Sequence, residues 1–360
     1  MKATRTIRII TSLSLAVVVI SAISWLGLGQ ISSAINRVDV FGTLDKRPEK
    51  PSTALNYLLV GSDTREGLTK EQSRLLRVGT TKSAAGARSD TMLLVHISKA
   101  RDKATIISIP RDSLVTIPEH QSSIYKDRII PAANGKINAA FAWGGAPLLI
   151  QTIENETGVR IDHYVEIGFA GFAGVVDSLG GIEVCSKRDI DDPKSHLVMS
   201  AGVHTLNGVE ALKYVRTRDF DGMGDLGRMQ RQQQFMSAVL RKLTSTGVLL
   251  NPVKLINFFN SAIATVKTDS QLNSNDLLTL AKQLKNLSAS KVRTLTIPLS
   301  NANARVDGVG SVVIWDKELA PDLFNRMRLD LPLIDEVTPS PSASSSATPK
   351  PILVDKFKTR

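Results

Sequence analysis

Tyr214 to Gln234 reads YVRTRDFDGMGDLGRMQRQQQ and concentrates four arginines, three acidic residues and a run of glutamines. Arg216 and Arg218 are two positions apart, which on an extended or turning backbone places both guanidinium groups on one side, and Arg228 and Arg231 are about one helical turn apart. A guanidinium group is a planar, permanently charged donor that matches phosphate oxygens. The stretch therefore predicts a site for a ligand with more than one phosphate, although a solvated charged face is the commoner role of an arginine-rich stretch.

The second half of this stretch has the periodicity of a helix. Apolar residues and one glutamine recur at spacings of three and four, which predicts a helix from about residue 225 to residue 243. A neighbouring stripe contains Arg228, Gln232, Phe235 and Val239. One helix can thus pack on the core and present Arg228 and Gln232 to a ligand.

Three predicted strands upstream each have an Asp and an Arg at one end. The strand 56–60 leads into Gly61-Ser62-Asp63-Thr64-Arg65, Arg88-Ser89-Asp90 precedes the strand 91–98, and the strand 104–109 leads into Pro110-Arg111-Asp112-Ser113. Each segment alone is compatible with an ordinary turn, because Asp, Gly and Ser favour turns. Three of them together indicate a ligand site, since open α/β sheets bind ligands at strand ends.

Two segments of small and apolar residues suggest either a core or a cavity. Residues 169–179 (FAGFAGVVDSL) are almost wholly apolar and are predicted to form a helix that is buried or lines an apolar cavity, beside the Ala/Gly-rich residues 139–146. Core packing is the commoner role of such a helix. Helices 147–157 and 208–215 and strands 164–167 and 182–185 are also predicted, and helix 208–215 leads into the arginine stretch. The predicted elements after residue 250 are interpreted as scaffold: helices 252–266, 275–287 and 318–326, and strands 292–297 and 311–315.

The N-terminal residues predict a membrane anchor. Residues 1–8 contain three basic residues and no acid, and residues 9–28 have no charged side chain, which is long enough for a transmembrane helix. A cleaved signal peptide is the alternative, but its apolar region would be shorter. The basic flank places residues 1–8 in the cytoplasm and the rest outside the cell membrane. We expect a linker over 29–54, a catalytic domain over 55–335 and a disordered Ser/Pro-rich tail over 336–360.

The composition narrows the classes of partner and site. The formal net charge of +11 favours anionic lipid or a polyanionic polymer, and no DNA-recognition pattern is present, so nucleic acid is not an expected partner. Cys185 is the single cysteine, which excludes an intrachain disulfide, and we expect it to be buried in its strand. The five histidines lack the spacing of a zinc site.

Seven motifs between residues 56 and 243 are similar, in sequence and in order, to those of the LytR-CpsA-Psr family of cell-wall glycopolymer ligases: GSDTR, RSDTM, IPRDS, GKINAAF, VDSLGGIEV, LNGVEALKYVRTR and DLGRMQRQQ. The resemblance implies an α/β fold in which helices flank a central mixed β-sheet, with an apolar pocket for a polyprenyl chain and an arginine-lined mouth for its pyrophosphate, preceded by one transmembrane helix. It also implies an enzyme that transfers a glycopolymer from a polyprenyl pyrophosphate carrier to peptidoglycan.

The same resemblance assigns roles to individual residues. It implies that Asp63 and Asp90 bind Mg²⁺, or Mn²⁺, near the pyrophosphate, and that these two residues and Arg111 form the catalytic group. Carboxylate oxygens suit such an ion. The pyrophosphate-binding positions implied by the motifs are Arg65, Arg88, Arg111, Lys136, Arg216, Arg218, Arg228 and Gln232.

The residues themselves are compatible with phosphoryl transfer, which depends mainly on positioning and on neutralisation of the phosphate oxygens. The GxxxxGK[ST] loop typical of many nucleoside triphosphate sites is missing. Two alternatives to the ligase stay open: a hydrolase that releases the same pyrophosphate to water, and a non-catalytic, membrane-anchored regulator of the envelope or of transcription. The identity of the polymer, the prenyl length and the general base do not follow from the sequence.

Overall fold

A computed structural model describes residues 36–78, 89–123, 125, 127–218, 224–245, 266–272, 276, 279, 287 and 291–333. The predicted anchor (9–28) and the predicted tail (336–360) lie outside these ranges. Within them, no helix combines the length and the apolar character needed to cross a bilayer.

The centre of the fold is a seven-stranded sheet. The pair β2–β9 and the pair β4–β15 are parallel, whereas β2–β3 and β3–β4 are antiparallel, so the predicted central mixed sheet is confirmed. Every residue of β4 is buried, as expected for a strand covered on both faces. The strands, in their order across the sheet, are β1 (Asn36–Val38), β14 (Val266–Asp269), β9 (His163–Ile167), β2 (Leu55–Ser62), β3 (Ser89–Ile97), β4 (Ala104–Ile109) and β15 (Val292–Thr296).

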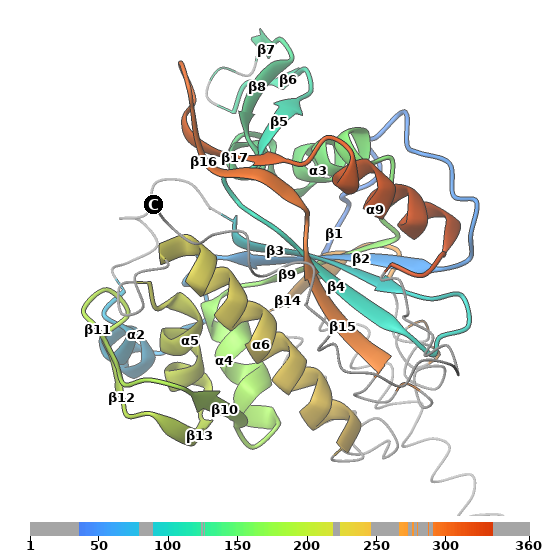
Figure 1. Cartoon of the computed structure of the whole chain (residues 1–360). Coiled ribbons are helices and arrows are strands. Elements are labelled where there is room, and N and C mark those ends of the chain that lie inside the picture. The colour runs from blue at the N-terminus through green and yellow to red at the C-terminus, as the bar shows by residue number, and fades with distance from the viewer. Residues whose placement is uncertain are drawn as a thin grey trace, which may run out of the picture.

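Helices cover both faces of this sheet (Figure 1). The helices α3 (Ile137–Thr157) and α9 (Leu319–Leu329) pack on one face, where their apolar side chains join the main core. The other face is covered by helices that form a second apolar cluster: α4 (Phe169–Ser178), α5 (Gly208–Arg216) and α6 (Gly224–Ser245), with α2 (Lys70–Leu76) beside α5.

Helix α3 is longer than predicted and has a kink. It begins at Ile137, and the kink lies at Gly145, whose φ of 65° is accessible to glycine, just before Pro147. The predicted helix 147–157 is therefore the second half of α3. Its Ala/Gly-rich first half packs into the main core with Ala140 and Phe141.

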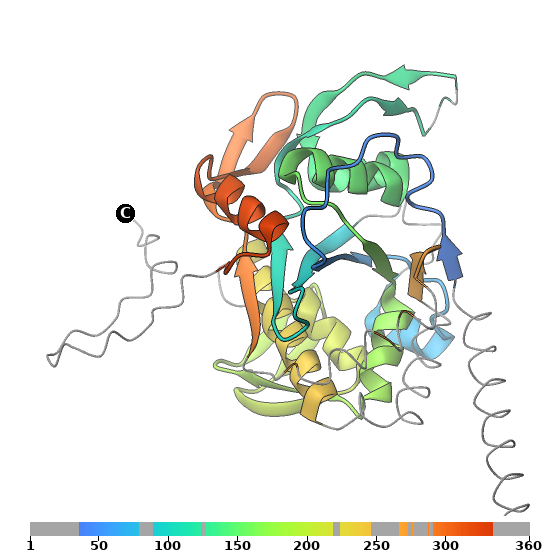
Figure 2. The same cartoon turned by 90° about the vertical axis from the view of Figure 1, so that its right-hand side faces the viewer.

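In the described part of the chain, five two-stranded sheets surround the central layers. An extended arm projects from the body next to the hairpin β16–β17 (Figure 2). Cys185, in β10, is exposed, so its predicted burial was wrong. Alternate residues of β10 face the solvent because this small sheet is covered on one side only. The pairs are β5 (Leu114–Ile117) with β8 (Ala133–Lys136) and β6 (His120–Gln121) with β7 (Ile129–Ile130), which form the arm, and β10 (Ile182–Ser186) with β13 (Gly202–Leu206), β11 (Ile190–Asp192) with β12 (Leu197–Met199), and β16 (Leu299–Val306) with β17 (Gly310–Trp315).

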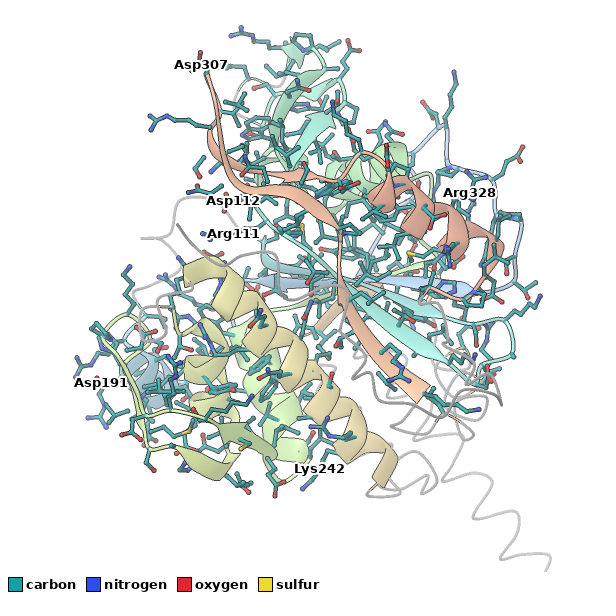
Figure 3. All side chains as sticks on the ribbon, in the orientation of Figure 1. Arg111, Asp112, Asp191, Lys242, Asp307 and Arg328 are labelled. Atoms are coloured by element: carbon teal, nitrogen blue, oxygen red, sulfur yellow. The ribbon has the colours of Figure 1, made fainter. Side chains whose placement is uncertain are left out.

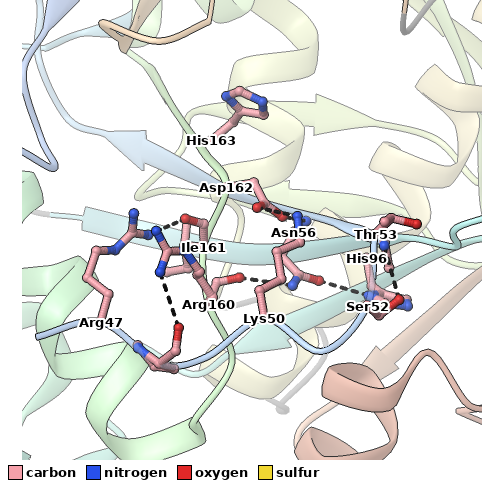
Figure 4. Close-up of polar contacts among 12 residues, drawn as sticks. Arg47, Lys50, Ser52, Thr53, Asn56, His96, Arg160, Ile161, Asp162 and His163 are labelled. Carbon is pink, nitrogen blue, oxygen red and sulfur yellow. Dashed lines mark hydrogen bonds and ion pairs between the residues drawn. The ribbon is translucent and has the colours of Figure 1, made fainter.

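Residues 36–54, which we expected to be part of a linker, pack against the domain. β1 pairs with β14, and Val40 is fully buried in the main core. The Arg47 guanidinium bonds to the buried Glu154 carboxylate, with Nη2 to Oε1 at 2.6 Å. It also donates to the carbonyl oxygen of Ile161 (Figure 4). The folded part of the chain therefore begins before Leu55.

A cluster of three polar side chains lies near this contact, at the end of the sheet where β2 begins. The buried His96 ring contacts Asn56 Oδ1 at 2.8 Å (Figure 4). Its other nitrogen contacts Asp330 Oδ1 at 3.1 Å. Burial lowers the pKa of His96, and the hydrogen bond with Asp330 acts in the opposite direction. These contacts join α9 to β2 and β3, so this end of the sheet is closed by structural contacts.

The segment after residue 250 differs in part from expectation. The predicted helix 252–266 lies outside the described residues except at its end, where Val266 begins the strand β14. The fully buried Asp269 accepts hydrogen bonds from the backbone N–H groups of Tyr164 and Leu272 at 3.0 and 2.9 Å. Most of the predicted helix 275–287 also lies outside the described residues.

Candidate functional site

The predicted strand-end residues meet at one end of the central sheet. β2 and β9 are parallel and finish there, β4 also finishes there, and the antiparallel β3 begins there. Residues of β2, β3 and β9 at this end line a cavity of about 350 Å³. Ligand-binding groups collected from separate strands thus lie at one edge, as in other α/β sheets.

The larger cavity has an apolar wall and a cationic side. Its apolar lining includes Ile167 at the end of β9, Phe169 and Phe172 from α4, and Phe235 and Met236 from α6. Its cationic and amide lining comes from Lys194, Arg216, Arg218, Arg228 and Gln232. Such a cavity suits an amphipathic anion with a long apolar group.

The turn at the end of α5 places Arg216 and Arg218 on this cavity. Asn207 caps the start of α5, and its side chain and that of Glu210 form a reciprocal capping box. The helix stops at Thr217, which is fully buried and whose hydroxyl donates to the carbonyl oxygen of Tyr214 at 2.8 Å. Arg216 and Arg218, on either side of Thr217, both line the larger cavity.

Two further contacts orient this turn. The backbone N–H of Arg218 donates to Oδ2 of Asp192 at 2.5 Å, and Oδ1 of the same carboxylate accepts from Lys194 N at 2.8 Å. The Arg216 guanidinium lies over the Phe169 ring, with its central carbon 5.0 Å from the ring centroid. An arginine that stacks on an aromatic ring keeps its edge available for phosphate oxygens.

Helix α6 contributes side chains to both the site and its support. Arg228 and Gln232 are one turn apart and line the larger cavity, as predicted for this helix. Arg231, which the sequence paired with Arg228, instead donates from Nη2 to the carbonyl oxygen of Thr217 at 2.6 Å and does not line the cavity. Positions three apart on a helix differ by about 60° around its axis, so the two arginines start from one side of α6 but contact different neighbours.

A second cavity, of about 260 Å³, adjoins the first. Four residues line both cavities, namely Thr91, Leu93, Arg228 and Gln232. Arg111 and Asp112 lie on the second cavity, between the hairpin β16–β17 and the N-terminal end of α6 (Figure 3). Arg111 thus lines the smaller cavity, whereas Arg216 and Arg218 line the larger one.

The turn 110–113 that carries Arg111 is held by α3 and by its own side chain. The backbone N–H of Ile137 donates to the Ser113 carbonyl at 2.9 Å, and that of Asn138 to the Arg111 carbonyl at 3.1 Å. The Ser113 hydroxyl donates to the Pro110 carbonyl at 2.7 Å. The motifs IPRDS and GKINAAF, which are separate in sequence, therefore form one structural unit.

Asp63 and Asp90 come from neighbouring strand ends. Gly61 pairs with Thr91 and Ser62 pairs with Ser89, so Asp90 is the extra residue of a β-bulge, and Asp63 directly follows the paired Ser62. Bulges redirect a side chain out of the regular alternation of a strand. Among the described residues, no group of three or more His, Cys, Asp or Glu side chains could bind a metal ion. Two carboxylates fit Mg²⁺ or Mn²⁺ when phosphate oxygens and water complete the coordination.

The loop 62–65 that contains Asp63 is fixed against the start of α4. The backbone N–H of Phe169 donates to the Thr64 carbonyl at 3.1 Å. A Cβ at Gly168 would lie 2.4 Å from Oγ1 of Thr64, so this close approach requires glycine. The residues GSDTR are thus adjacent to the larger cavity, whose lining includes Gly61, Ser62 and Gly168.

The structure separates the predicted pyrophosphate residues into three groups. Arg111, Arg216, Arg218, Arg228 and Gln232 line one or both cavities. Arg65 and Lys136 line neither cavity, and Lys136 pairs with Asp112 at 3.0 Å. Arg88 lies outside the described residues.

The expectation that the small residues of 139–146 and 169–179 line an apolar cavity needs a correction. None of residues 139–146 lines the larger cavity, because α3 lies on the opposite face of the sheet. Ala173 of α4 is also a core residue: a Cβ at Gly208 would lie 2.4 Å from the Ala173 carbonyl oxygen, so α4 and α5 touch there. Within α4, Phe169 and Phe172 face the cavity.

Sequence reasoning missed two contributors to the site. Lys194 lies in a segment without a motif, although its neighbour Asp192 organises the arginine turn. The hairpin β16–β17 was treated as scaffold, yet Asn303 and Ser311 line the smaller cavity. No local pattern distinguishes these residues from ordinary surface positions.

Comparisons with known proteins agree with this fold. The chain matches the LytR_cpsA_psr family over residues 30–328. It is 39% identical over 297 residues to the probable cell wall biosynthesis protein LcpB of Corynebacterium glutamicum, covering 82% of this chain and 66% of the relative. The chain therefore spans slightly less than two thirds of the length of LcpB.

Other matches carry a more specific name or a structure. The chain is 30% identical over 250 residues to the polyisoprenyl-teichoic acid–peptidoglycan teichoic acid transferase TagU of Bacillus cereus, covering 68% of this chain and 73% of the relative. The structure is similar to that of TagT bound to LI-WTA, with a TM-score of 0.58, 25% identity and coverage of 82% of this chain and 99% of TagT.

Proposed function

The chain belongs to the LytR_cpsA_psr family, and from this premise we propose that it is a phosphotransferase that moves a polyprenyl-pyrophosphate-linked glycopolymer onto peptidoglycan and forms a phosphodiester bond. The names of its relatives support this activity, since they refer to cell wall biosynthesis and to transfer from a polyisoprenyl carrier to peptidoglycan. The single structural observation that carries the proposal is the group of arginines beside an apolar cavity at the strand ends.

Each part of the donor has a matching surface. The isoprene units nearest the pyrophosphate occupy the apolar part of the larger cavity, where burial stabilises them by about 25 cal/mol per Å². Arg216, Arg218 and Arg228 bind the pyrophosphate oxygens, and Gln232 adds an amide donor. The residues that line both cavities, which form their shared wall, then hold the phosphorus atom of the pyrophosphate that is nearest the glycan.

The transfer step exchanges one phosphorus–oxygen bond for another. The acceptor hydroxyl oxygen bonds to the phosphorus nearest the glycan, and the bond from that phosphorus to the bridging oxygen breaks. Polyprenyl monophosphate leaves with the bonding electron pair, and the hydroxyl proton passes to water. The arginines stabilise the charge on the phosphate oxygens, and their fixed positions lower the cost of orienting the donor.

Asp63 and Asp90 are the proposed ligands of Mg²⁺ or Mn²⁺. When bound, the ion would neutralise phosphate oxygens beside the arginines. The supporting observation is that Asp63 follows Ser62 and Asp90 precedes Thr91 on two paired strands, and that Ser62 and Thr91 both line the larger cavity. Without such an ion, two carboxylates would repel the pyrophosphate.

We also propose that the domain works outside the cell membrane, tethered by residues 9–28. The formal net charge of +11 favours the anionic carrier lipid and its polyanionic polymer over a neutral ligand. Both substrates would then be on the same side of the membrane as the cavities.

The test uses the full chain in detergent micelles with a polyprenyl-pyrophosphate-linked oligosaccharide, with and without peptidoglycan glycan strands. We expect mass spectrometry to show rapid formation of a phosphodiester-linked product and of polyprenyl monophosphate only when acceptor is present. Equal donor consumption with and without acceptor, giving the glycan phosphate alone, would instead identify a hydrolase. Donor that stays intact under all conditions would indicate a non-catalytic protein.

A further inference from the structure

The hairpin β16–β17 forms a fixed wall of the smaller cavity. The backbone N–H of Val313 donates to the Asp112 carbonyl at 2.8 Å, and the indole N–H of Trp315 donates to the Ser113 hydroxyl at 2.8 Å. Trp315 also packs against Phe324 of α9, with ring centroids 5.6 Å apart. The hairpin is therefore held to the turn that carries Arg111.

This cavity combines apolar and hydrogen-bonding surfaces. Met92 and Ile109 from the central sheet, and Val312 and Val313 from β17, supply buried apolar lining. Ser311 Oγ donates to Asn303 Oδ1 at 2.8 Å, and both residues are exposed. Because this bond uses the amide oxygen of Asn303, its NH₂ group remains a donor.

The cavity also contains an acidic group. Of the described residues that line either cavity, Asp112 is the one with a carboxylate. It pairs with Arg111, from Nε to Oδ2 at 3.4 Å, and with Lys136 at 3.0 Å. Alternating amide, hydroxyl, carboxylate and cationic groups around an apolar surface match a sugar, which has apolar C–H faces and polar hydroxyl groups.

The two cavities meet at the four residues that line both of them, and this arrangement bears on the direction of attack. In phosphoryl transfer the attacking and leaving oxygens are roughly in line with the phosphorus. With the prenyl phosphate in the larger cavity and the phosphorus beside Arg228 and Gln232, the in-line approach comes from the smaller cavity.

We propose that the smaller cavity binds the saccharide that bears the attacking hydroxyl group, and that Asn303 and Ser311 select this acceptor by hydrogen bonds to its hydroxyl or amide groups. The proposal rests on the transferase function proposed above. The sugar of the donor has the same chemistry, but in-line attack places it to the side of the phosphorus. Asn303 and Ser311 are thus specificity-determining residues for the acceptor.

The test compares Asn303→Leu and Ser311→Ala with a matched control, Asn134→Leu, in the full chain. Asn134 is also an exposed asparagine that accepts a side-chain hydroxyl bond, from Thr116 at 3.3 Å, and it lines neither cavity. Initial rates are measured while peptidoglycan glycan strands and the lipid-linked donor are varied separately. Melting temperatures verify that each variant is folded.

We expect Asn303→Leu and Ser311→Ala to raise the KM for the acceptor about three- to tenfold, the effect of losing one or two neutral hydrogen bonds, and to leave the KM for the donor unchanged. The control should match the unmodified chain. If the KM for the donor rises instead, the cavity binds the donor sugar and the proposal is wrong. If both variants match the control while transfer proceeds, the proposal fails and the transferase function stands. If donor consumption never depends on acceptor, the transferase function fails and the acceptor site with it.

Discussion

Nη2 of Arg231 donates a hydrogen bond of 2.6 Å to the carbonyl oxygen of Thr217, the residue between Arg216 and Arg218. The contact connects α6 to the turn after α5, and Gln232 Nε2 adds a bond to the Val215 carbonyl at 3.2 Å. The position of the two cavity arginines therefore depends on the neighbouring helix as well as on their own segment.

The first prediction separates Arg231 from Arg228, two residues of similar exposure, 6% and 5%. Arg231→Met should lower the free energy of unfolding by about 1.5–3 kcal/mol, because it removes a charged donor and leaves the Thr217 carbonyl without this bond. Arg228→Met should cost less stability, since Arg228 shares a cavity with Arg216 and Arg218 and like charges repel. Urea unfolding of the full chain measures both.

Activity at a temperature where both variants are folded completes this comparison. Arg228→Met should lose most of its transfer activity through loss of a pyrophosphate contact. A stability loss at Arg228 that equals the loss at Arg231 would show that Arg228 is chiefly structural.

The second prediction concerns Arg216 and Arg218. Replacing either with Ala should reduce kcat/KM by about ten- to a hundredfold, as expected for a charge-assisted hydrogen bond of about 1.5–3 kcal/mol. Lys should restore little, because an ammonium group cannot form the bidentate contact. Steady-state kinetics with the lipid-linked donor measures the effect, and Arg241→Ala, at an exposed position on α6, is the control. Full activity of both Lys variants would contradict bidentate binding of the pyrophosphate by Arg216 and Arg218.

The third prediction tests the packing of residues 36–54. Arg47→Ala should destabilise the domain by about 3–5 kcal/mol, because it leaves the Glu154 carboxylate, only 2% exposed, without its cation. Lys50→Ala is the control, since the Lys50–Asp162 pair is more exposed and worth about 0–1 kcal/mol. Urea unfolding followed by circular dichroism checks both. Equal, small effects would mean that the segment is a linker after all.

The fourth prediction concerns lipid in the larger cavity. Met236 lines the cavity and is partly exposed, so Met236→Trp adds bulk to open space rather than to a filled core. It should reduce the polyprenyl phosphate that remains bound through purification, with a small change in melting temperature. Met236→Leu, a similar volume, should retain lipid. Quantitative mass spectrometry of extracted lipid decides, and unchanged retention in Met236→Trp would exclude lipid from this cavity.

The fifth prediction concerns the metal ion. Chelation should abolish transfer, and Mg²⁺ or Mn²⁺ should restore it in the unmodified chain but not in Asp63→Asn or Asp90→Asn. Asp102→Asn is the control, because Asp102 lies between β3 and β4 at the opposite end of the sheet. Transfer that continues unchanged in excess chelator would rule out a metal requirement.

Local patterns in the sequence predicted much of the framework. The strand 104–109 coincides with β4, and the predicted helix 225–243 lies within α6, because burial and helical periodicity repeat along a short segment. Strand ends that carry Asp and Arg correctly indicated one edge of the sheet. The resemblance to a family added the assignment of individual residues to pyrophosphate binding. Five of these residues line the cavities, namely Arg111, Arg216, Arg218, Arg228 and Gln232.

The sequence by itself determined the central strands 56–60, 91–98 and 104–109, the helix 225–243 and the segments where charged groups gather, since those properties depend on neighbours a few positions away. Only the tertiary structure decided that Arg231 supports the turn while Arg228 lines both cavities, that α3 lies on the opposite face from the larger cavity, and that Asn303 and Arg111 line one cavity. These outcomes depend on contacts between segments that are far apart in the chain, such as the bond from Val313 to Asp112. Such contacts leave no periodic signal, because each is made once and its partner is chosen by the packing of the whole sheet.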